Sequence, residues 1–273
     1  MYDESDRLII DYRSLLDDDT KNENDIQRFL EKNSELIPTI SYRLNHGIHH
    51  SAIISKYPFG NSYVSDLMYL TKSTVRWNVV FIELENQQDK IFCKNGNFTA
   101  KFNHALQQIR GWKAYLNDPI HVAYFITEIS KFIAMPTFLK NPVDFKYLLV
   151  FGRNEELVNN QERIHLFSEL SDETQTVITY DSLISIYQNN PKVKHVILSP
   201  KGNGNFKIKF FPEGLGTSLF GYLKPSELEI SPSIIEVLKS EGYEIDKWLA
   251  GDRLMVNNKL AKDTFYKTIG SVD

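Results

Sequence analysis

The spacing of apolar residues predicts a helix near the start of the chain. Ile26, Phe29 and Leu30 recur at the i, i+3, i+4 spacing of one helix face. Thr20 and Glu23, just before them, have the spacing of a capping box, in which two side chains bind the backbone of the first helical turn. We therefore expect this helix to begin near Thr20.

A β-hairpin is predicted after this helix. Residues 63–70 and 77–83 are rich in β-branched and aromatic side chains, and the segment between them contains polar residues. A turn centred between Thr74 and Val75 would place Asp66 directly opposite Glu83. Two carboxylates would then face each other across the hairpin.

Helices and strands alternate along the rest of the chain. Apolar residues at steps of four and three between Phe98 and Leu116 predict a long amphipathic helix. This order is typical of an α/β fold. Strands are then expected at residues 146–151, 176–180, 195–198 and 206–211, and helices at residues 181–187, after Pro232 and after Glu244.

The length of 273 residues exceeds that of an ordinary single domain. Asn189-Asn190-Pro191 resembles a linker. We therefore divide the chain into an acidic N-terminal segment (residues 1–19), a main domain (residues 20–190) and a smaller α+β extension of unknown role (residues 191–273).

Composition indicates a globular protein, because 42% of the residues are apolar. Cys93 is the only cysteine and no secretory leader is recognised at the N-terminus, so we expect a cytoplasmic protein. The longest apolar stretch, residues 121–135, contains Glu128 and Lys131, and no membrane span is predicted. The Gly202-Asn203-Gly204-Asn205 run lacks the Gly-Lys-Ser/Thr of a phosphate loop, so we predict a turn and no nucleotide cofactor.

The net charge of −4 is unfavourable for a protein that binds nucleic acid. Residues 182–212, however, contain no acid, and this stretch either faces phosphates or forms an ordinary solvated surface. Its lysines are Lys192, Lys194, Lys201, Lys207 and Lys209.

Three acids could form one site. Glu83 and Glu85 are two apart on a strand and leave it on the same face. With Asp66 beside them, repulsion and burial would be too unfavourable without a cation, and oxygen ligands favour Mg²⁺ or Mn²⁺. The alternative is that Glu83 and Glu85 only mark the point where a strand emerges into solvent.

A second group of possible metal ligands is His46, His49 and His50, which lie close together in a loop-like region. No other cluster has a matching spacing. We therefore predict that these are solvated loop histidines.

The chain resembles the PD-(D/E)xK nucleases through Glu23 in the first helix, Asp66 on one strand, Glu83-Leu84-Glu85 on the next, and Gln108 four before Trp112 on the following helix. More narrowly, it resembles the nuclease domain of Shedu anti-phage defence proteins. The motifs that carry this second resemblance are Glu23-Asn24-Asp25-Ile26-Gln27-Arg28-Phe29-Leu30, Phe151-Gly152-Arg153 and Thr179-Tyr180-Asp181-Ser182-Leu183.

The resemblance implies a restriction-endonuclease-like core, a mixed central sheet flanked by helices, that hydrolyses DNA phosphodiesters with Mg²⁺ or Mn²⁺. Asp66 and Glu83 would hold the metal. Glu85 stands where a Lys is usual, and would be a second-metal ligand or a base. Gln108 would position the metal water or the phosphate, and Lys101 is a candidate to supply the missing positive charge.

Glu23 ranks below the other acids, because a capping role explains it equally well. We expect a homo-oligomer, since a DNA duplex has two strands to cut. A second hypothesis follows from Glu85: a catalytically lapsed module that keeps the fold and binds nucleic acid or a partner protein.

Overall fold

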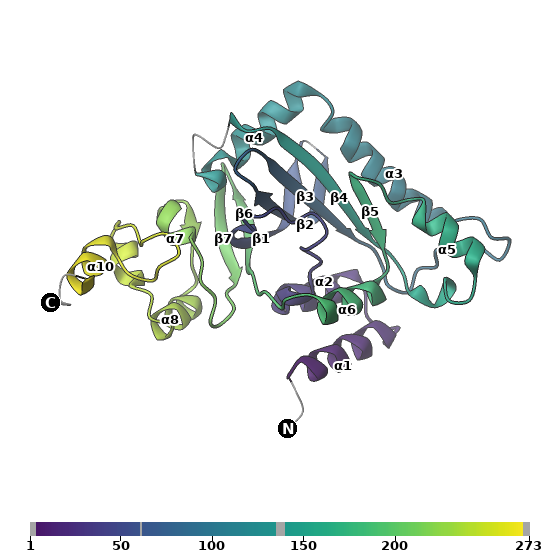
Figure 1. Cartoon of the computed structure of the whole chain (residues 1–273), viewed down its shortest axis with the longest axis horizontal. Helices are drawn as coiled ribbons and strands as arrows, with labels where there is room; N and C mark the ends of the chain where they lie inside the picture. Colours follow the sequence, from purple (N-terminus) through teal and green to yellow (C-terminus); the bar gives the residue numbers. More distant parts are fainter. Residues whose placement is uncertain (1–3, 61, 135–139, 270–273) are drawn as a thin grey trace.

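The computed structural model describes residues 4–60, 62–134 and 140–269 (Figure 1). At its centre is a mixed sheet of eight strands in the order β5-β4-β3-β2-β1-β6-β7-β8. β1 is antiparallel to β2 and β2 to β3, whereas β4 is parallel to β3 and β6 is parallel to β1. The predicted α/β class, with a mixed sheet flanked by helices, is confirmed.

The strands that precede the predicted linker include the two that form the expected hairpin. β7 and β8 extend the sheet beyond β6. The bounds are β1 Ile48–Phe59, β2 Tyr63–Lys72, β3 Trp77–Leu84, β4 Val143–Val150, β5 Gln175–Ile178, β6 Val196–Gly202, β7 Asn205–Phe210 and β8 Leu228–Glu229.

Helices cover both faces of the sheet (Figure 1). α3 and α4 pack on one face, and α1, α2 and α6 pack on the other. The helices are α1 Glu4–Asp17, α2 Glu23–Lys32, α3 Ala100–Tyr115, α4 Pro119–Ile133, α5 Gln161–Ser168, α6 Tyr180–Asn189, α7 Leu219–Tyr222, α8 Pro232–Ser240, α9 Ile245–Leu249 and α10 Lys262–Ile269, with short 3₁₀ helices at Ser34–Leu36 and Asn154–Glu156.

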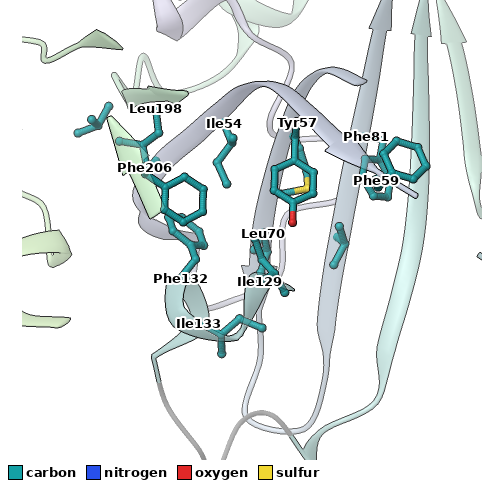
Figure 2. Packing of buried hydrophobic residues seen from close by; sticks show 14 of the residues in the cluster. Ile54, Tyr57, Phe59, Leu70, Phe81, Ile129, Phe132, Ile133, Leu198 and Phe206 are labelled. Carbon is teal, nitrogen blue, oxygen red and sulfur yellow. The ribbon is translucent and has the colours of Figure 1, made fainter. Parts of the chain in front are cut away.

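The larger core lies between the sheet and helices α3 and α4. Figure 2 shows Phe59 and Phe81 from two strands of the sheet packed together, and Phe132 of α4 close to Phe206 of β7. β1 therefore contributes to the same core as the strands that follow the predicted linker.

The predicted hairpin register is correct. Leu67 pairs with Ile82 and Lys72 pairs with Trp77, which is the register that brings Asp66 opposite Glu83. The pairing of β2 with β3 ends at Leu67 and Ile82, so Asp66 and Glu83 lie just beyond it, at the open end of the hairpin in the middle of the sheet.

The start of α2 differs from the prediction. Asn22 is its N-cap, and Asn22 and Asp25 form the reciprocal capping box, so Thr20 and Glu23 do not. Asn caps a helix at least as well as Thr because its side-chain oxygen reaches the free backbone N–H groups. Thr20 instead donates its hydroxyl hydrogen bond to Asp18 in the preceding turn.

Residues beyond 190 continue the same sheet. β6 pairs with β1, and the turn predicted at Gly202-Asn203-Gly204-Asn205 joins β6 to β7. The acidic N-terminal segment, of which residues 1–3 lie outside the described part, forms α1. Its Ile9 and Tyr12 are buried in the smaller core, between the sheet and helices α1, α2 and α6. The domain boundaries stay a prediction.

The prediction of three solvated loop histidines is wrong for two of them. His49 and His50 lie on β1 and are buried, with their rings in contact and both Nε2 atoms on the Phe132 carbonyl. Burial lowers the pKa of His50 to about 4. Only His46 is exposed. Across the described residues, no helix has the length and apolar character needed to cross a membrane.

Candidate active site

Asp66 and Glu83 lie next to each other at the open end of the hairpin. Both are buried, with Asp66 4% and Glu83 8% exposed. The Asp66 Oδ2 accepts a hydrogen bond from the backbone N–H of Leu84 at 2.7 Å. The backbone N–H of Leu84 thus bonds to the Asp66 side chain where the backbone ladder between β2 and β3 has ended. This bond fixes the Asp66 carboxylate beside Glu83.

The two oxygens of Glu83 have different surroundings. Gln108 of α3 donates its amide N–H to Oε1, which confirms that Gln108 faces the acids. Oε2 is buried and has no hydrogen-bond partner among the described residues. Burial raises the pKa of Glu83 well above its ordinary value, and the nearby Asp66 and Glu85 raise it further. The site therefore favours a proton or a cation at Glu83.

Glu85 follows β3 directly and is only partly buried. Its backbone carbonyl accepts a hydrogen bond from the hydroxyl of Tyr180 at 2.5 Å. Burial, followed by repulsion from Glu23 and Asp66, raises the pKa of Glu85 to about 7. Glu85 can therefore exchange a proton near neutral pH.

Glu23 joins the site from the first turn of α2. Because the cap is made by Asn22 and Asp25, the carboxylate of Glu23 is not needed there. Burial and the proximity of Asp66 raise the pKa of Glu23. Glu23 thus belongs to the same acidic group, and the reason for ranking it below the others is removed.

Lys56 is a residue of this site that the sequence analysis missed. It lies on β1, and its ammonium group contacts Oδ1 of Asp66 and lies 3.9 Å from the Glu23 carboxylate. The nearby histidines His46, His49 and His50 were expected in a loop-like region, so nothing placed Lys56 on a strand beside β2. The pairing of Ser55 with Leu67 and Tyr57 with Ser65 brings it there.

Lys101, the candidate for the missing positive charge, lies elsewhere. Its Nζ pairs with Asp89 at 2.6 Å, and its side chain is 70% exposed. It lies close enough to lower the pKa of Glu85, but burial and the surrounding acids outweigh it. Lys56 is the lysine that contacts the buried acid.

A third buried acid, Glu31 of α2, supports the site. Glu31 is 2% exposed and forms an ion pair with Lys209 of β7 at 2.6 Å. Ser55 donates a hydrogen bond to Glu31, and Gln27 donates to the backbone carbonyl of Asp66 at 3.2 Å. This network joins α2, β1, β2 and β7, and it fixes the backbone of Asp66 through the hydrogen bond from Gln27.

Asp66 and Glu83 suit a hard divalent cation by their donor chemistry. Both offer carboxylate oxygens, and Mg²⁺ is usually held by one or two carboxylates together with water and substrate phosphates. Among the described residues, no group of three or more His, Cys, Asp and Glu side chains is arranged to hold a metal ion. The three-carboxylate set with Glu85 therefore stays a prediction.

Two open hollows flank Tyr63 beside the site. One, of about 540 Å³, is lined by Gln108, His104 and Gly111 of α3. The other, of about 500 Å³, is lined by Tyr115 and other aromatic residues, and both share Tyr63. A substrate in the first hollow would lie next to Gln108, which donates a hydrogen bond to Glu83.

Three lysines of the acid-free stretch are already paired with acids from elsewhere in the chain. Lys201 and Lys207 pair with Glu229 at 2.9 and 3.0 Å, and Lys209 pairs with Glu31. These pairs reduce the positive charge that the stretch can offer to phosphates. The prediction that it binds DNA therefore depends mainly on Lys192 and Lys194.

Comparison with known proteins identifies a family. The model of the family described as Shedu protein SduA, C-terminal, matches residues 20–184. The matched segment includes Glu23, Asp66, Glu83 and Gln108. No curated protein matches the chain. Because the family model covers more than half of the chain, this protein belongs to the Shedu protein SduA C-terminal family.

Proposed function

We propose that this protein is a divalent-metal-dependent DNA endonuclease that acts in defence against phage. Family membership supports the defence role and the nuclease class. The observation that carries the chemistry is Glu83, a buried carboxylate whose Oε2 has no hydrogen-bond partner in the part of the chain that the structure describes and which lies close to Asp66 and Glu85. Such a group is unfavourable unless a proton or cation compensates it.

In this proposal Asp66 and Glu83 hold Mg²⁺ or Mn²⁺. The bound ion would lower the pKa of a water molecule and neutralise charge on the phosphoryl group. Gln108 fixes Oε1 of Glu83 and leaves Oε2 directed to the ligand. Glu23 adds a further acid at the edge of the site.

Glu85 acts as the base in this scheme, with second-metal ligand as its alternative role. Its pKa is about 7 in the metal-free site, and a cation held by Asp66 and Glu83 would lower it, which favours the carboxylate form that accepts a proton. The water oxygen bonds to phosphorus, one ester P–O bond breaks, and the water proton passes through the Glu85 carboxylate to the leaving oxygen. Net hydrolysis of one phosphodiester results.

DNA would approach the site along the hollows beside Tyr63. Aromatic side chains there can stack on bases whatever the sequence. We also propose a homo-oligomer, because a DNA duplex has two strands to cut and two paired sites would cut both. A strict monomer in a solution mass measurement would contradict this.

The second candidate function is a catalytically lapsed module that binds nucleic acid or a partner protein. Glu85 favours it, because a carboxylate occupies the position where the resemblance expects a lysine. A carboxylate cannot supply the positive charge of an ammonium group.

Plasmid nicking separates the two candidates. We expect the purified protein to nick supercoiled DNA with Mn²⁺ or Mg²⁺ and to stop when EDTA is added. Asp66→Asn should not nick the plasmid. Asp144→Asn, which changes an acid paired with Arg76 at the opposite end of β3 and β4, should cut like the parent. If the protein binds the plasmid in Ca²⁺ but does not nick it in Mn²⁺ or Mg²⁺, the result would indicate the lapsed module.

A further inference from the structure

Lys56 has an unusual backbone for a strand residue. Its φ is +50°, in the left-handed region that non-glycine side chains rarely adopt. Side chains normally alternate between the two faces of a sheet. Here Ile54, Tyr57 and Phe59 all lie in the core beneath α3 and α4, so the alternation shifts once, at Lys56 (Figure 2).

The shift in side-chain alternation at Lys56 brings its ammonium group into the site. It allows β1 to keep burying Tyr57 and Phe59 while the side chain of Lys56 turns toward the acids of β2 and α2. Strained backbone of this kind persists only where the surroundings enforce it, and it is concentrated at functional sites. A neutral or smaller residue would bury the same aromatics without bringing a charge to Asp66.

The charges around Lys56 are one-sided. Its ammonium group contacts Asp66 and lies 3.9 Å from the Glu23 carboxylate, and Glu83 lies next to Asp66. Among the described residues, no other lysine or arginine forms an ion pair with any of these three acids. Phosphodiester hydrolysis places negative charge on the phosphoryl oxygens, which needs a fixed positive group nearby.

We propose that Lys56 is a catalytic residue, whose ammonium group contacts the scissile phosphate and stabilises the charge that develops there. This inference rests on the proposed nuclease function. Lys56 thus provides from β1 a positive charge that the position of Glu85 cannot provide. In the free protein the same group rests on Asp66, which keeps it within reach of the reacting phosphate.

The alternative is that Lys56 only neutralises the acids and so stabilises the fold. The two roles separate in a glycine variant, because glycine adopts φ near +50° without strain. Lys56→Gly therefore removes the ammonium group while the backbone shift is retained. Lys101→Met is the matched control, since Lys101 lies close enough to Glu85 to affect its pKa while its ammonium group pairs with Asp89.

The test compares parent, Lys56→Gly and Lys101→Met. Nicking rates are measured at saturating Mn²⁺, DNA affinity in Ca²⁺, and melting temperature in EDTA. We expect Lys56→Gly to melt as a folded protein and to nick at least about a hundredfold more slowly, as when one charge-stabilising group is removed. Lys101→Met should nick within a few-fold of the parent.

Chemical rescue provides a readout that a structural role would not change. Added methylammonium should restore part of the Lys56→Gly rate in a saturable manner, without raising its melting temperature or its DNA affinity. Parent-like nicking by Lys56→Gly, or slow nicking that no amine restores, would overturn the catalytic role of Lys56 alone. If the parent itself never cuts, the proposed function fails and this inference fails with it.

Discussion

Glu83 is the side chain whose surroundings bear most directly on function. Gln108 donates a hydrogen bond to one of its oxygens, and the other is buried with no hydrogen-bond partner among residues 4–60, 62–134 and 140–269. Ordinary folding would avoid such an arrangement, because an unpaired buried carboxylate oxygen is unfavourable unless a ligand compensates it. The Glu83 carboxylate therefore fits a role in binding a ligand better than a role in stabilising the fold.

Glu83→Gln should separate folding from cleavage. The amide keeps the shape but removes the charge, so we expect nicking to fall at least about a hundredfold. The melting temperature in EDTA should be equal to or higher than that of the parent, because a buried charge with a raised pKa is lost. A nicking rate equal to that of the parent would place the reaction elsewhere.

Glu85 predicts a pH dependence of stability in the metal-free protein. Its pKa rises from the ordinary 4.5 to about 7 on folding, so between these pH values the folded state binds more protons than the unfolded state. The stability contributed by this group is full below pH 4.5 and is lost as pH rises to 7.

Thermal unfolding of parent and Glu85→Gln in EDTA tests this dependence. The variant does not titrate, so its advantage over the parent should be small at pH 5 and larger at pH 8. A difference in melting temperature that is the same at both pH values would mean that Glu85 is not perturbed.

At the scale of elements, the N-terminus of α2 positions Glu23. The Asn22 side chain accepts hydrogen bonds from the N–H groups of Asn24 and Asp25, and the Asp25 carboxylate accepts one from the backbone N–H of Asn22. Asn22→Ala should therefore lower the free energy of unfolding by about 0.5–2 kcal/mol. Thr20→Ala should change it by less than about 0.5 kcal/mol, as for an exposed side chain.

Urea denaturation of both variants measures these free energies. Equal losses for Asn22→Ala and Thr20→Ala, or a larger loss for Thr20→Ala, would contradict the cap assignment. The result also bears on the site, because a cap made by Asn22 and Asp25 does not use the Glu23 carboxylate. That carboxylate can then belong to the acidic group with Asp66.

Much of the element order follows from sequence periodicity. The spacing in residues 98–116 predicted α3, the β-forming residues around Asp66 and Glu83 predicted both strands, and the position of the turn predicted their register. These predictions hold because they depend on local patterns and on a turn only a few residues long. Gln108 was placed correctly for the same reason, since it lies on the flank of a regular helix.

The contribution of β1 was not predictable in this way. Its histidines, turn-like residues and left-handed positions at His50, Ser51 and Lys56 interrupt the alternation that marks a strand. His49 and His50 are buried because α4 covers them, and Lys56 reaches the site because β1 pairs with β2. Both facts depend on contacts between distant segments, which a local pattern does not contain.

At the scale of the whole molecule, the C-terminal part of the chain is joined to the site. β6 pairs with β1, and Lys209 of β7 neutralises Glu31 behind Asp66. Part of the positive charge predicted for DNA binding therefore serves the fold. Within the described residues, Lys192 and Lys194 form no ion pair with an acid, and Lys192 lies 4.8 Å from the ring of Tyr187.

Charge reversal at Lys192 and Lys194 tests whether this surface meets DNA. Each lost phosphate contact should lower the slope of log affinity against log salt by about 1 and weaken binding to all sequences alike. Lys201→Glu provides a comparison, because its charge is already balanced by Glu229. Unchanged affinity and slope in the double variant would make this an ordinary solvated surface.

The most direct test of the metal-dependent nuclease site is a crystal structure with DNA and Mn²⁺, read by anomalous diffraction. We predict a peak at coordination distance, about 2.0–2.2 Å, from carboxylate oxygens of both Asp66 and Glu83, with a phosphate oxygen completing the ligands. A structure with DNA bound and no peak beside Glu83, or with the metal held elsewhere, would contradict the assignment of this site.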